Sequence, residues 1–497
     1  MIKMLNARAA GVLLPISALS GDLGIGTLGE SAYAFVDFLA QAKQRYWQIL
    51  PLCPTGYGDS PYQSVSTFAG NPYFIDLKRL ETEGYLTAQD YTSLCWGSDN
   101  NRVNYARLYT QRQTVFQAAF VRFLQQEPAD FSAFCREQAD WLEDYALFMA
   151  IKSAHRGAPF TAWEPDIRRH HPRAVLHWRC KCADSIRYWK MLQYFFYKQW
   201  QDLKKYANEK GIFIIGDIPI YVAADSADVW SNQTLFRLND KGLPREVAGC
   251  PPDAFSKEGQ LWGNPVYDWN HMKKDGYSWW VRRLQMSLHL YDVLRIDHFR
   301  GFDSYYCIPG TAVTAKTGIW RKGPGMALFQ TVKKQLGELP ILAEDLGFLT
   351  DSVKKLLEDS GFPGMKVLQF AFDSREDNDY LPENYPENCV VYTGTHDNDT
   401  ILGWAQNAPP MDVRCARKYL GAKNNRELVW CMMDAALQSR ANTCILTMQD
   451  LLELGADARM NTPSTVGGNW QWRMQQKDLN KELAKKLAQH TQDAGRC

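Results

Sequence analysis

Eight apolar runs of strand length recur along the chain, and each ends in polar, glycine or proline residues. They occupy residues 11–17, 46–54, 212–222, 293–299, 340–347, 366–373, 389–398 and 444–450. Most of the segments between them show a helical repeat of apolar positions, as in residues 350–361, where Thr350 or Asp351 can cap the start and Gly361 the end. Continuous Val/Ile/Leu runs that alternate with helices predict parallel strands covered by helices.

Eight strand–helix units favour a closed (β/α)8 TIM barrel of the α/β class over an open doubly wound sheet. No GxGxxG turn follows the first run, which weakens the dinucleotide-binding alternative. We predict one catalytic barrel over residues 1–497, with a mostly helical insertion at 80–205 after the second strand. A loop-rich insertion at 225–280 follows the third strand. After the eighth run only a final loop and helices fit, so we expect no C-terminal β-domain.

Composition supports a large folded core, because 45% of the 497 residues are hydrophobic and 13% are aromatic. The 56 Lys and Arg residues balance the 55 Asp and Glu residues, and no basic run is interleaved with aromatic residues. Nucleic acid and anionic membranes are therefore not expected as partners. No run approaches the ~18 apolar residues of an ordinary transmembrane helix.

The N-terminal residues superficially resemble a secretory signal, with a basic start, a short apolar run and small residues after it. We favour the alternative that residues 11–16 form the first barrel strand, because the barrel needs that strand. The twelve cysteines are scattered and show no spacing framework. Dispersed reduced thiols favour a cytoplasmic protein.

Carboxylates stand at the ends of four predicted strands: Asp217, Asp297, Glu344 and Asp397. In a parallel barrel the C-terminal ends of the strands face the active-site mouth, so the four acids are expected to converge there. Any one of them could instead cap a helix or pair with a neighbouring cation. Acids at four strand ends of one chain favour a common site.

Two further acids are interpreted as structural, because Asp345 and Asp399 each precede a helical segment and suit an N-cap or first-turn role. A metal is not required by this set of carboxylates. The segment that most resembles a calcium-binding loop is residues 373–384, and it lacks the glycine that an EF-hand loop needs. We therefore expect no metal and no cofactor.

Two carboxyl groups about 5–5.5 Å apart can perform a double displacement at a sugar carbon, one as nucleophile and the other as acid and then base. Strand alternation puts Val293, Arg295 and Asp297 on one side, so the arginine would favour the ionised form of Asp297. Asp297 is the predicted nucleophile. Partial burial and neighbouring acids should raise the pKa of Glu344 toward that of a general acid.

The remaining polar residues suit a sugar that develops positive charge. Asp397 would stay ionised against an oxocarbenium-like transition state, while His396 and Arg295 could donate to sugar hydroxyls or hold the carboxylates. The early loop at residues 56–64 lacks the GK[ST] ending of a phosphate loop. Its Tyr57 and Tyr62 suit stacking on a sugar better than binding of a phosphate.

Six motifs occur in an order that resembles a known family: SPYQS, GDIPIYV, PPDAFSKEGQLWGNPVYDW, LRIDHFRG, AEDLG and TGTHDN. In this order they resemble the 4-α-glucanotransferases, also called amylomaltases or disproportionating enzymes, of glycoside hydrolase family 77 in the α-amylase-like clan. The likeness extends from residues 11–26 to residues 460–470, so it spans nearly the whole chain.

The resemblance implies a barrel with helical insertions and a retaining mechanism, with Asp297 as nucleophile, Glu344 as acid/base and Asp397 as transition-state stabiliser. The implied substrates are maltooligosaccharides and starch or glycogen-type α-glucans. The implied substrate-binding residues are Ser60, Tyr62, Asp217, Phe255, Trp262, Arg295, His298, His396 and Asn461. Phe255 and Trp262 would line the acceptor side within a lid.

Two other functions remain as alternatives. An α-glucan hydrolase would use the same three carboxylates with water as the acceptor, and sequence chemistry does not separate hydrolysis from transfer. A non-catalytic glucan-binding protein would lack at least one of the three carboxylates, and all three are present. The resemblance favours transfer.

Overall fold

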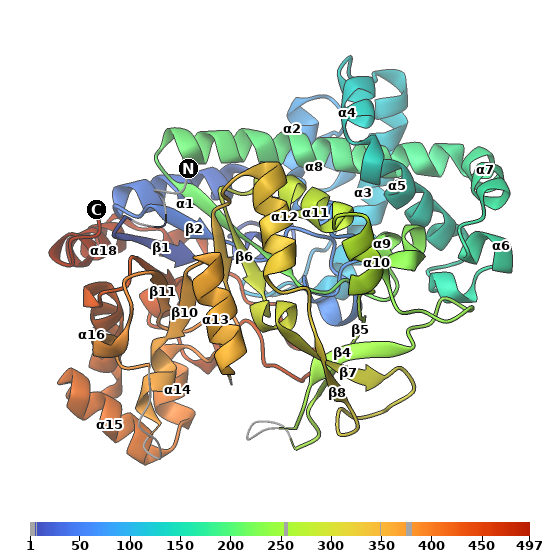
Figure 1. Cartoon of the computed structure of the whole chain (residues 1–497). Coiled ribbons are helices and arrows are strands. Elements are labelled where there is room, and N and C mark those ends of the chain that lie inside the picture. Colours follow the sequence, from blue (N-terminus) through green and yellow to red (C-terminus); the bar gives the residue numbers. More distant parts are fainter. Residues whose placement is uncertain (1–4, 6, 253–256, 348, 374–379) are drawn as a thin grey trace.

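A barrel of eight parallel strands forms the centre of the computed structural model, which describes residues 5, 7–252, 257–347, 349–373 and 380–497 (Figure 1). The barrel strands are β1 (Ala9–Leu13), β2 (Tyr46–Gln48), β3 (Phe213–Pro219), β6 (Val293–Asp297), β9 (Ile341–Ala343), β10 (Gly364–Val367), β11 (Cys389–Tyr392) and β12 (Thr443–Thr447). Each overlaps one of the eight apolar runs, so the predicted barrel is confirmed.

The strands pair in the order β10-β11-β12-β1-β2-β3-β6-β9. The remaining seam is closed between β9 and the residue before β10, where the backbone N–H of Ala343 donates to the carbonyl of Pro363 at 3.0 Å. Near the start of β1, the Arg496 Nη1 donates to the carbonyl of Ala9 at 3.1 Å. The C-terminal end of the chain is thereby attached to the first strand of the barrel.

Neither Asp345 nor Asp399 takes the N-cap or first-turn position predicted for it. Asp345 accepts a hydrogen bond at 2.6 Å from the backbone N–H of Met365 on β10, so it reinforces the seam of the barrel. Asp399 stands one residue before the N-cap of α14, which is Thr400. Its Oδ1 accepts from the backbone N–H of Thr400 at 2.8 Å, so Asp399 still contacts the start of the helix that follows it, whereas Asp345 does not.

Alternate residues of the strands point into the barrel and fill it. Every strand contributes to this buried set, which comprises Ala9, Leu13, Tyr46, Ile215, Val293, Leu342, Met365, Val367, Val390, Tyr392 and Ile445. Burial of each large apolar side chain is worth about 1.5–3 kcal/mol. Gly11 on β1 makes room for this packing, because a Cβ there would lie 2.5 Å from the Cβ of Tyr46.

Helices cover the outside of the barrel and build the segment between β2 and β3 (Figure 1). That segment contains the long helix α8 and six others, and no helix in the described ranges is long and apolar enough to span a membrane. The helices are α1 (Glu30–Gln41), α2 (Leu77–Thr82), α3 (Tyr105–Gln125), α4 (Phe131–Glu137), α5 (Ala139–Ala154), α6 (Pro165–Arg168), α7 (Pro172–Lys181), α8 (Ala183–Glu209), α9 (Ala227–Ser231), α10 (Trp269–Lys274), α11 (Ser278–Leu290), α12 (Met326–Leu336), α13 (Asp351–Ser360), α14 (Ile401–Asn407), α15 (Pro410–Leu420), α16 (Asn425–Gln438), α17 (Met448–Leu451) and α18 (Lys481–Asp493).

A second, antiparallel sheet was not predicted from the sequence. Its order is β5-β4-β7-β8, and it lies beside the barrel (Figure 1). The strands are β4 (Glu246–Cys250), β5 (Gln260–Pro265), β7 (Ser304–Pro309) and β8 (Ile319–Lys322). Glycine and proline in β4 and β5 weaken any strand pattern, and the sheet depends on pairing between β4 and the distant β7. The segment 225–280, expected to be loop-rich, therefore holds two of these strands as well as short helices.

Candidate active site

A layer of polar side chains lies at the C-terminal end of the barrel, directly above its apolar interior. Asp217, Arg295 and Glu344 each stand two residues after an interior apolar residue, namely Ile215, Val293 and Leu342. Since strand side chains alternate with a period of two, these three polar groups face the same interior. The alternation of strand side chains therefore places these three residues together at the C-terminal opening of the barrel.

Arg295 links two carboxylates within this layer. Its Nη1 donates to Asp217 Oδ2 at 2.6 Å and its Nη2 donates to Asp297 Oδ1 at 3.0 Å. The contact between Arg295 and Asp297 confirms the alternation predicted for this strand. Asp217 is fully buried, and burial raises its pKa although Arg295 opposes the shift. One guanidinium thus neutralises a buried acid and holds a half-buried one in place.

Glu344 follows β9 and has a different environment. Its Oε2 accepts from the backbone N–H of His298 at 2.7 Å, and its Oε1 accepts from that of Leu346 at 2.8 Å. Burial raises the pKa of Glu344 to about 7, and the charge of Asp297 acts in the same direction, whereas Arg295 and the two N–H donors oppose the shift. Glu344 is therefore suited to carry a proton near neutral pH.

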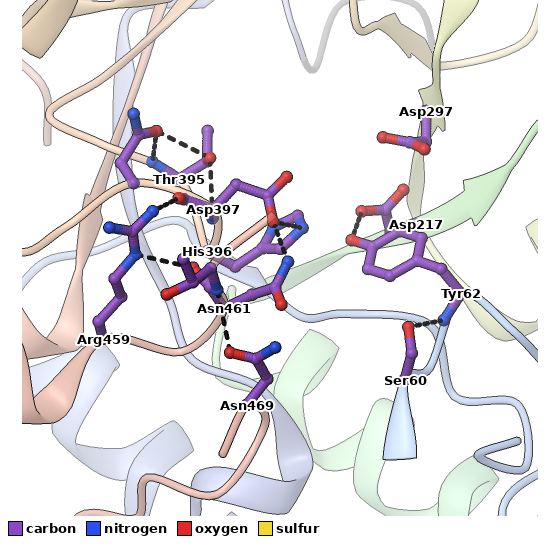
Figure 2. Close-up of polar contacts among 12 residues, drawn as sticks. Ser60, Tyr62, Asp217, Asp297, Thr395, His396, Asp397, Arg459, Asn461 and Asn469 are labelled. Atoms are coloured by element: carbon purple, nitrogen blue, oxygen red, sulfur yellow. Dashed lines mark hydrogen bonds and ion pairs between the residues drawn. The ribbon is translucent and has the colours of Figure 1, made fainter. Parts of the chain in front are cut away.

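Asp397 lies on the loop after β11, opposite the group formed by Asp217 and Asp297 (Figure 2). Its side chain is 45% exposed. Asp397 Oδ1 accepts from Asn461 Nδ2 at 2.6 Å and lies 3.4 Å from His396 Nε2. The carboxylate is thus oriented by an amide and an imidazole and remains open to the mouth.

Three aromatic rings connect the two sides of the site. The rings of Tyr62 and His396 stack with their centroids 5.2 Å apart and an interplanar angle of 16°. Trp470 packs against both, at 5.9 Å from Tyr62 and 5.8 Å from His396. The hydroxyl of Tyr62 donates to Asp217 Oδ2 at 2.8 Å, and the backbone N–H of Tyr62 donates to Ser60 Oγ at 3.2 Å (Figure 2).

His298 and Trp262 form the side of the site next to the antiparallel sheet. The two rings meet edge to face, with centroids 4.8 Å apart and an angle of 86°. Burial lowers the pKa of His298 to about 4, so its imidazole is neutral at pH 7. The backbone of His298 is left-handed, with φ 56°, and its N–H donates to Glu344. A neutral ring beside two carboxylates can donate to or accept from a sugar hydroxyl.

The structure brings nearly all of the predicted residues into one network. These are Ser60, Tyr62, Asp217, Trp262, Arg295, Asp297, His298, Glu344, His396, Asp397 and Asn461. Phe255, predicted for the acceptor side, lies outside the described residues. No group of three potential metal ligands is found in the part of the chain that is described.

Sequence reasoning missed three residues of the site. Trp470 completes the aromatic group, and Arg459 donates to the backbone carbonyl of Asp397 at 2.6 Å. Gln63 reaches the antiparallel sheet through its Nε2, which lies 3.1 Å from Asn264 Oδ1. Gln63 lies in the motif SPYQS and Trp470 ends the segment 460–470, so membership of these family-like segments was the available signal.

Known proteins resemble this chain along nearly its whole length. A family model described as 4-alpha-glucanotransferase matches residues 14–479. A 4-alpha-glucanotransferase of Clostridium butyricum is 47% identical, covering 97% of this chain and 99% of the relative. One from Streptococcus pneumoniae (strain TIGR4) is 50% identical, covering 96% and 95%. The structure of amylomaltase from Streptococcus agalactiae in complex with acarbose superposes with a TM-score of 0.96 at 45% identity, covering 98% and 99%.

Proposed function

The chain belongs to the 4-alpha-glucanotransferase family, glycoside hydrolase family 77, and we propose that it moves a segment of an α-1,4-glucan onto the 4-hydroxyl of an acceptor glucan or glucose. The observation that carries this proposal is the difference between two neighbouring carboxyl groups. Asp297 is held by Arg295, whereas the pKa of Glu344 is raised to about 7. Such a pair is what a retaining double displacement requires.

In the first half of the proposed reaction, Asp297 attacks the anomeric carbon while Glu344 gives its proton to the leaving glycosidic oxygen. This step forms a covalent glucosyl-enzyme and releases the reducing-end part of the donor. In the second half, Glu344 takes the proton of the acceptor 4-hydroxyl as that oxygen displaces Asp297. Both displacements invert the carbon, so the α-linkage is retained.

The other residues of the network have proposed roles in binding and stabilisation. Asp397 faces the positive charge that develops on the sugar in each transition state. Tyr62, Asp217, Arg295, His298 and His396 hold the ring beside the cleaved bond, with Ser60 and Asn461 supporting the two loops. Trp262 offers an apolar face for an acceptor sugar. The oligosaccharide analogue acarbose in the structure of the Streptococcus agalactiae relative supports a site for α-glucan chains.

The whole of residues 1–497 is proposed as one catalytic unit, in which 80–205 and 225–280 are insertions. The second insertion is proposed to carry the acceptor-side lid, since it contains Trp262. A cytoplasmic location is proposed as well, supported by twelve cysteines that are all present as free thiols.

Maltotriose as the sole substrate tests the proposed transfer. We expect glucose and a ladder of longer maltooligosaccharides, with the total number of reducing ends unchanged. Glucose and maltose with a matching rise in reducing ends would identify a hydrolase and refute transfer.

Asp297→Asn tests the nucleophile on the same substrate. It should abolish turnover while the thermal unfolding temperature stays close to that of the wild type. Asp240→Asn removes a charge from an exposed turn and serves as the matched control, which should keep full activity. Retained turnover in Asp297→Asn would reject the nucleophile assignment.

A further inference from the structure

Arg459 joins the loop that carries Asp397 to the C-terminal segment of the chain (Figure 2). Its Nη2 donates to the backbone carbonyl of Asp397 at 2.6 Å, and its Nε donates to the backbone carbonyl of Asn461 at 2.8 Å. The side chain is half-buried, and both of these contacts are to backbone carbonyls rather than to carboxylates. A guanidinium charge at this site therefore serves two backbone carbonyls.

Asn461 extends this connection to the reacting face of the loop. Its backbone N–H donates to the carbonyl of His396 at 3.0 Å, and its Nδ2 donates to Asp397 Oδ1 at 2.6 Å. Arg459 fixes the residue that makes both of these contacts. Loss of Arg459 would therefore release Asp397 directly through its own carbonyl and indirectly through Asn461.

Asp397 depends on contacts with other segments for its position more than the carboxylates at the strand ends do, because it lies on a loop. Asp297 is the last residue of a barrel strand, whereas β11 ends at Tyr392 and Asp397 lies five positions beyond it. The loop has local hydrogen bonds, including one from the backbone N–H of Asp397 to Thr395 Oγ1 at 3.2 Å. Because the Asp397 side chain is 45% exposed, side-chain packing alone does not hold the carboxylate.

We propose that Arg459 is a positioning residue for Asp397 in the transfer reaction. The inference rests on the proposed function, in which Asp397 stabilises the positively charged transition state. The planar guanidinium presents two donors in a fixed arrangement, which a lysine ammonium does not reproduce. A displacement of about 1 Å at a catalytic group lowers the rate on the order of 100-fold.

The test compares Arg459→Met and Arg459→Lys with a matched arginine at the opposite end of the barrel. Arg8 also donates to backbone carbonyls, with its Nη1 at 2.7 Å from Ser439 O and its Nη2 at 3.0 Å from Leu437 O. Arg8→Met should lower the unfolding temperature about as much as Arg459→Met does. It should leave the kcat for loss of maltotriose within about twofold of the wild type, since it is remote from the site.

Arg459→Met should lower kcat about 100-fold with KM changed less than about threefold, because a transition-state interaction is lost. The kcat of Arg459→Lys should lie between that of Arg459→Met and that of the wild type.

A maltosyl fluoride donor separates the role of Arg459 from that of the acid. It should relieve the first-step defect of Glu344→Gln, because fluoride leaves without a proton, but it should not relieve the defect of Arg459→Met. A kcat within twofold of the wild type in Arg459→Met, or an equal loss in Arg8→Met, would overturn the proposal. Since turnover is scored as loss of maltotriose, a failure of transfer itself would show separately as a missing ladder in the wild type.

Discussion

Replacing Glu344 by Gln should change the stability of the protein in a pH-dependent way. The pKa of this carboxyl is 4.5 ordinarily and about 7 in the folded protein, mainly because of burial. At about 1.36 kcal/mol for each pKa unit, the difference of about 2.5 corresponds to about 3 kcal/mol. Between pH 4.5 and 7 the folded state binds a proton that the unfolded state has released. The free energy of unfolding of the wild type therefore falls by about 3 kcal/mol as pH rises through this window.

The variant does not titrate at this position, but it carries a cost that is independent of pH. Both oxygens of Glu344 accept backbone N–H groups, from His298 and Leu346. A glutamine amide has one oxygen, so one of the two donors loses its partner at a cost of about 1–3 kcal/mol. This cost is the same at both pH values. It therefore drops out when the stability difference between variant and wild type at one pH is subtracted from the difference at the other.

Calorimetric unfolding temperatures at pH 4.5 and pH 8 measure the effect. For 497 residues the entropy of unfolding is about 1 kcal/mol/K, so about 3 kcal/mol corresponds to about 3 °C. The difference in unfolding temperature between the two proteins, Glu344→Gln minus wild type, should be about 3 °C more positive at pH 8 than at pH 4.5. Glu358→Gln, at an exposed position of α13, should show no such change. The same temperature difference at both pH values would refute the argument from the raised pKa.

Two further outcomes follow from the same contacts. The rate of transfer from maltotriose should fall above about pH 7, as Glu344 loses the proton that the leaving oxygen needs, and a rate that stays level to pH 9 would contradict its role as the acid. Tyr62→Phe should lower kcat/KM about tenfold, because Asp217 Oδ2 loses the 2.8 Å hydrogen bond from the hydroxyl inside a buried site. Tyr419→Phe removes a hydroxyl from an exposed contact with Glu383 and should leave kinetics unchanged, so equal effects in both variants would count against the role of Tyr62.

The catalytic strands were readable from the sequence because strand side chains alternate over a short range. In residues 293–297 apolar and polar positions follow this alternation, and the structure places Arg295 beside Asp297 as expected. The same rule places Asp217 and Glu344 above the apolar interior. Both the barrel and its acidic mouth were therefore predictable from local pattern.

Contacts between distant segments were not readable in the same way. The antiparallel sheet joins β4 to β7, and neither strand has a clear alternating pattern. Asp345 was assigned to a helix because a helix follows it, yet it binds Met365 across the closing seam. These interactions depend on which strands become neighbours when the barrel closes.

The sequence by itself determined the strands, the inward direction of their side chains and the carboxylates at their ends, because each depends on residues only a few positions apart. Tertiary structure alone decided the environment of those carboxylates. It buried Glu344 near Asp297, and it brought Arg459 and Trp470 from more than sixty positions away to support Asp397 and His396. Burial and through-space contact set pKa and orientation, and both arise only when the closed barrel brings remote segments together.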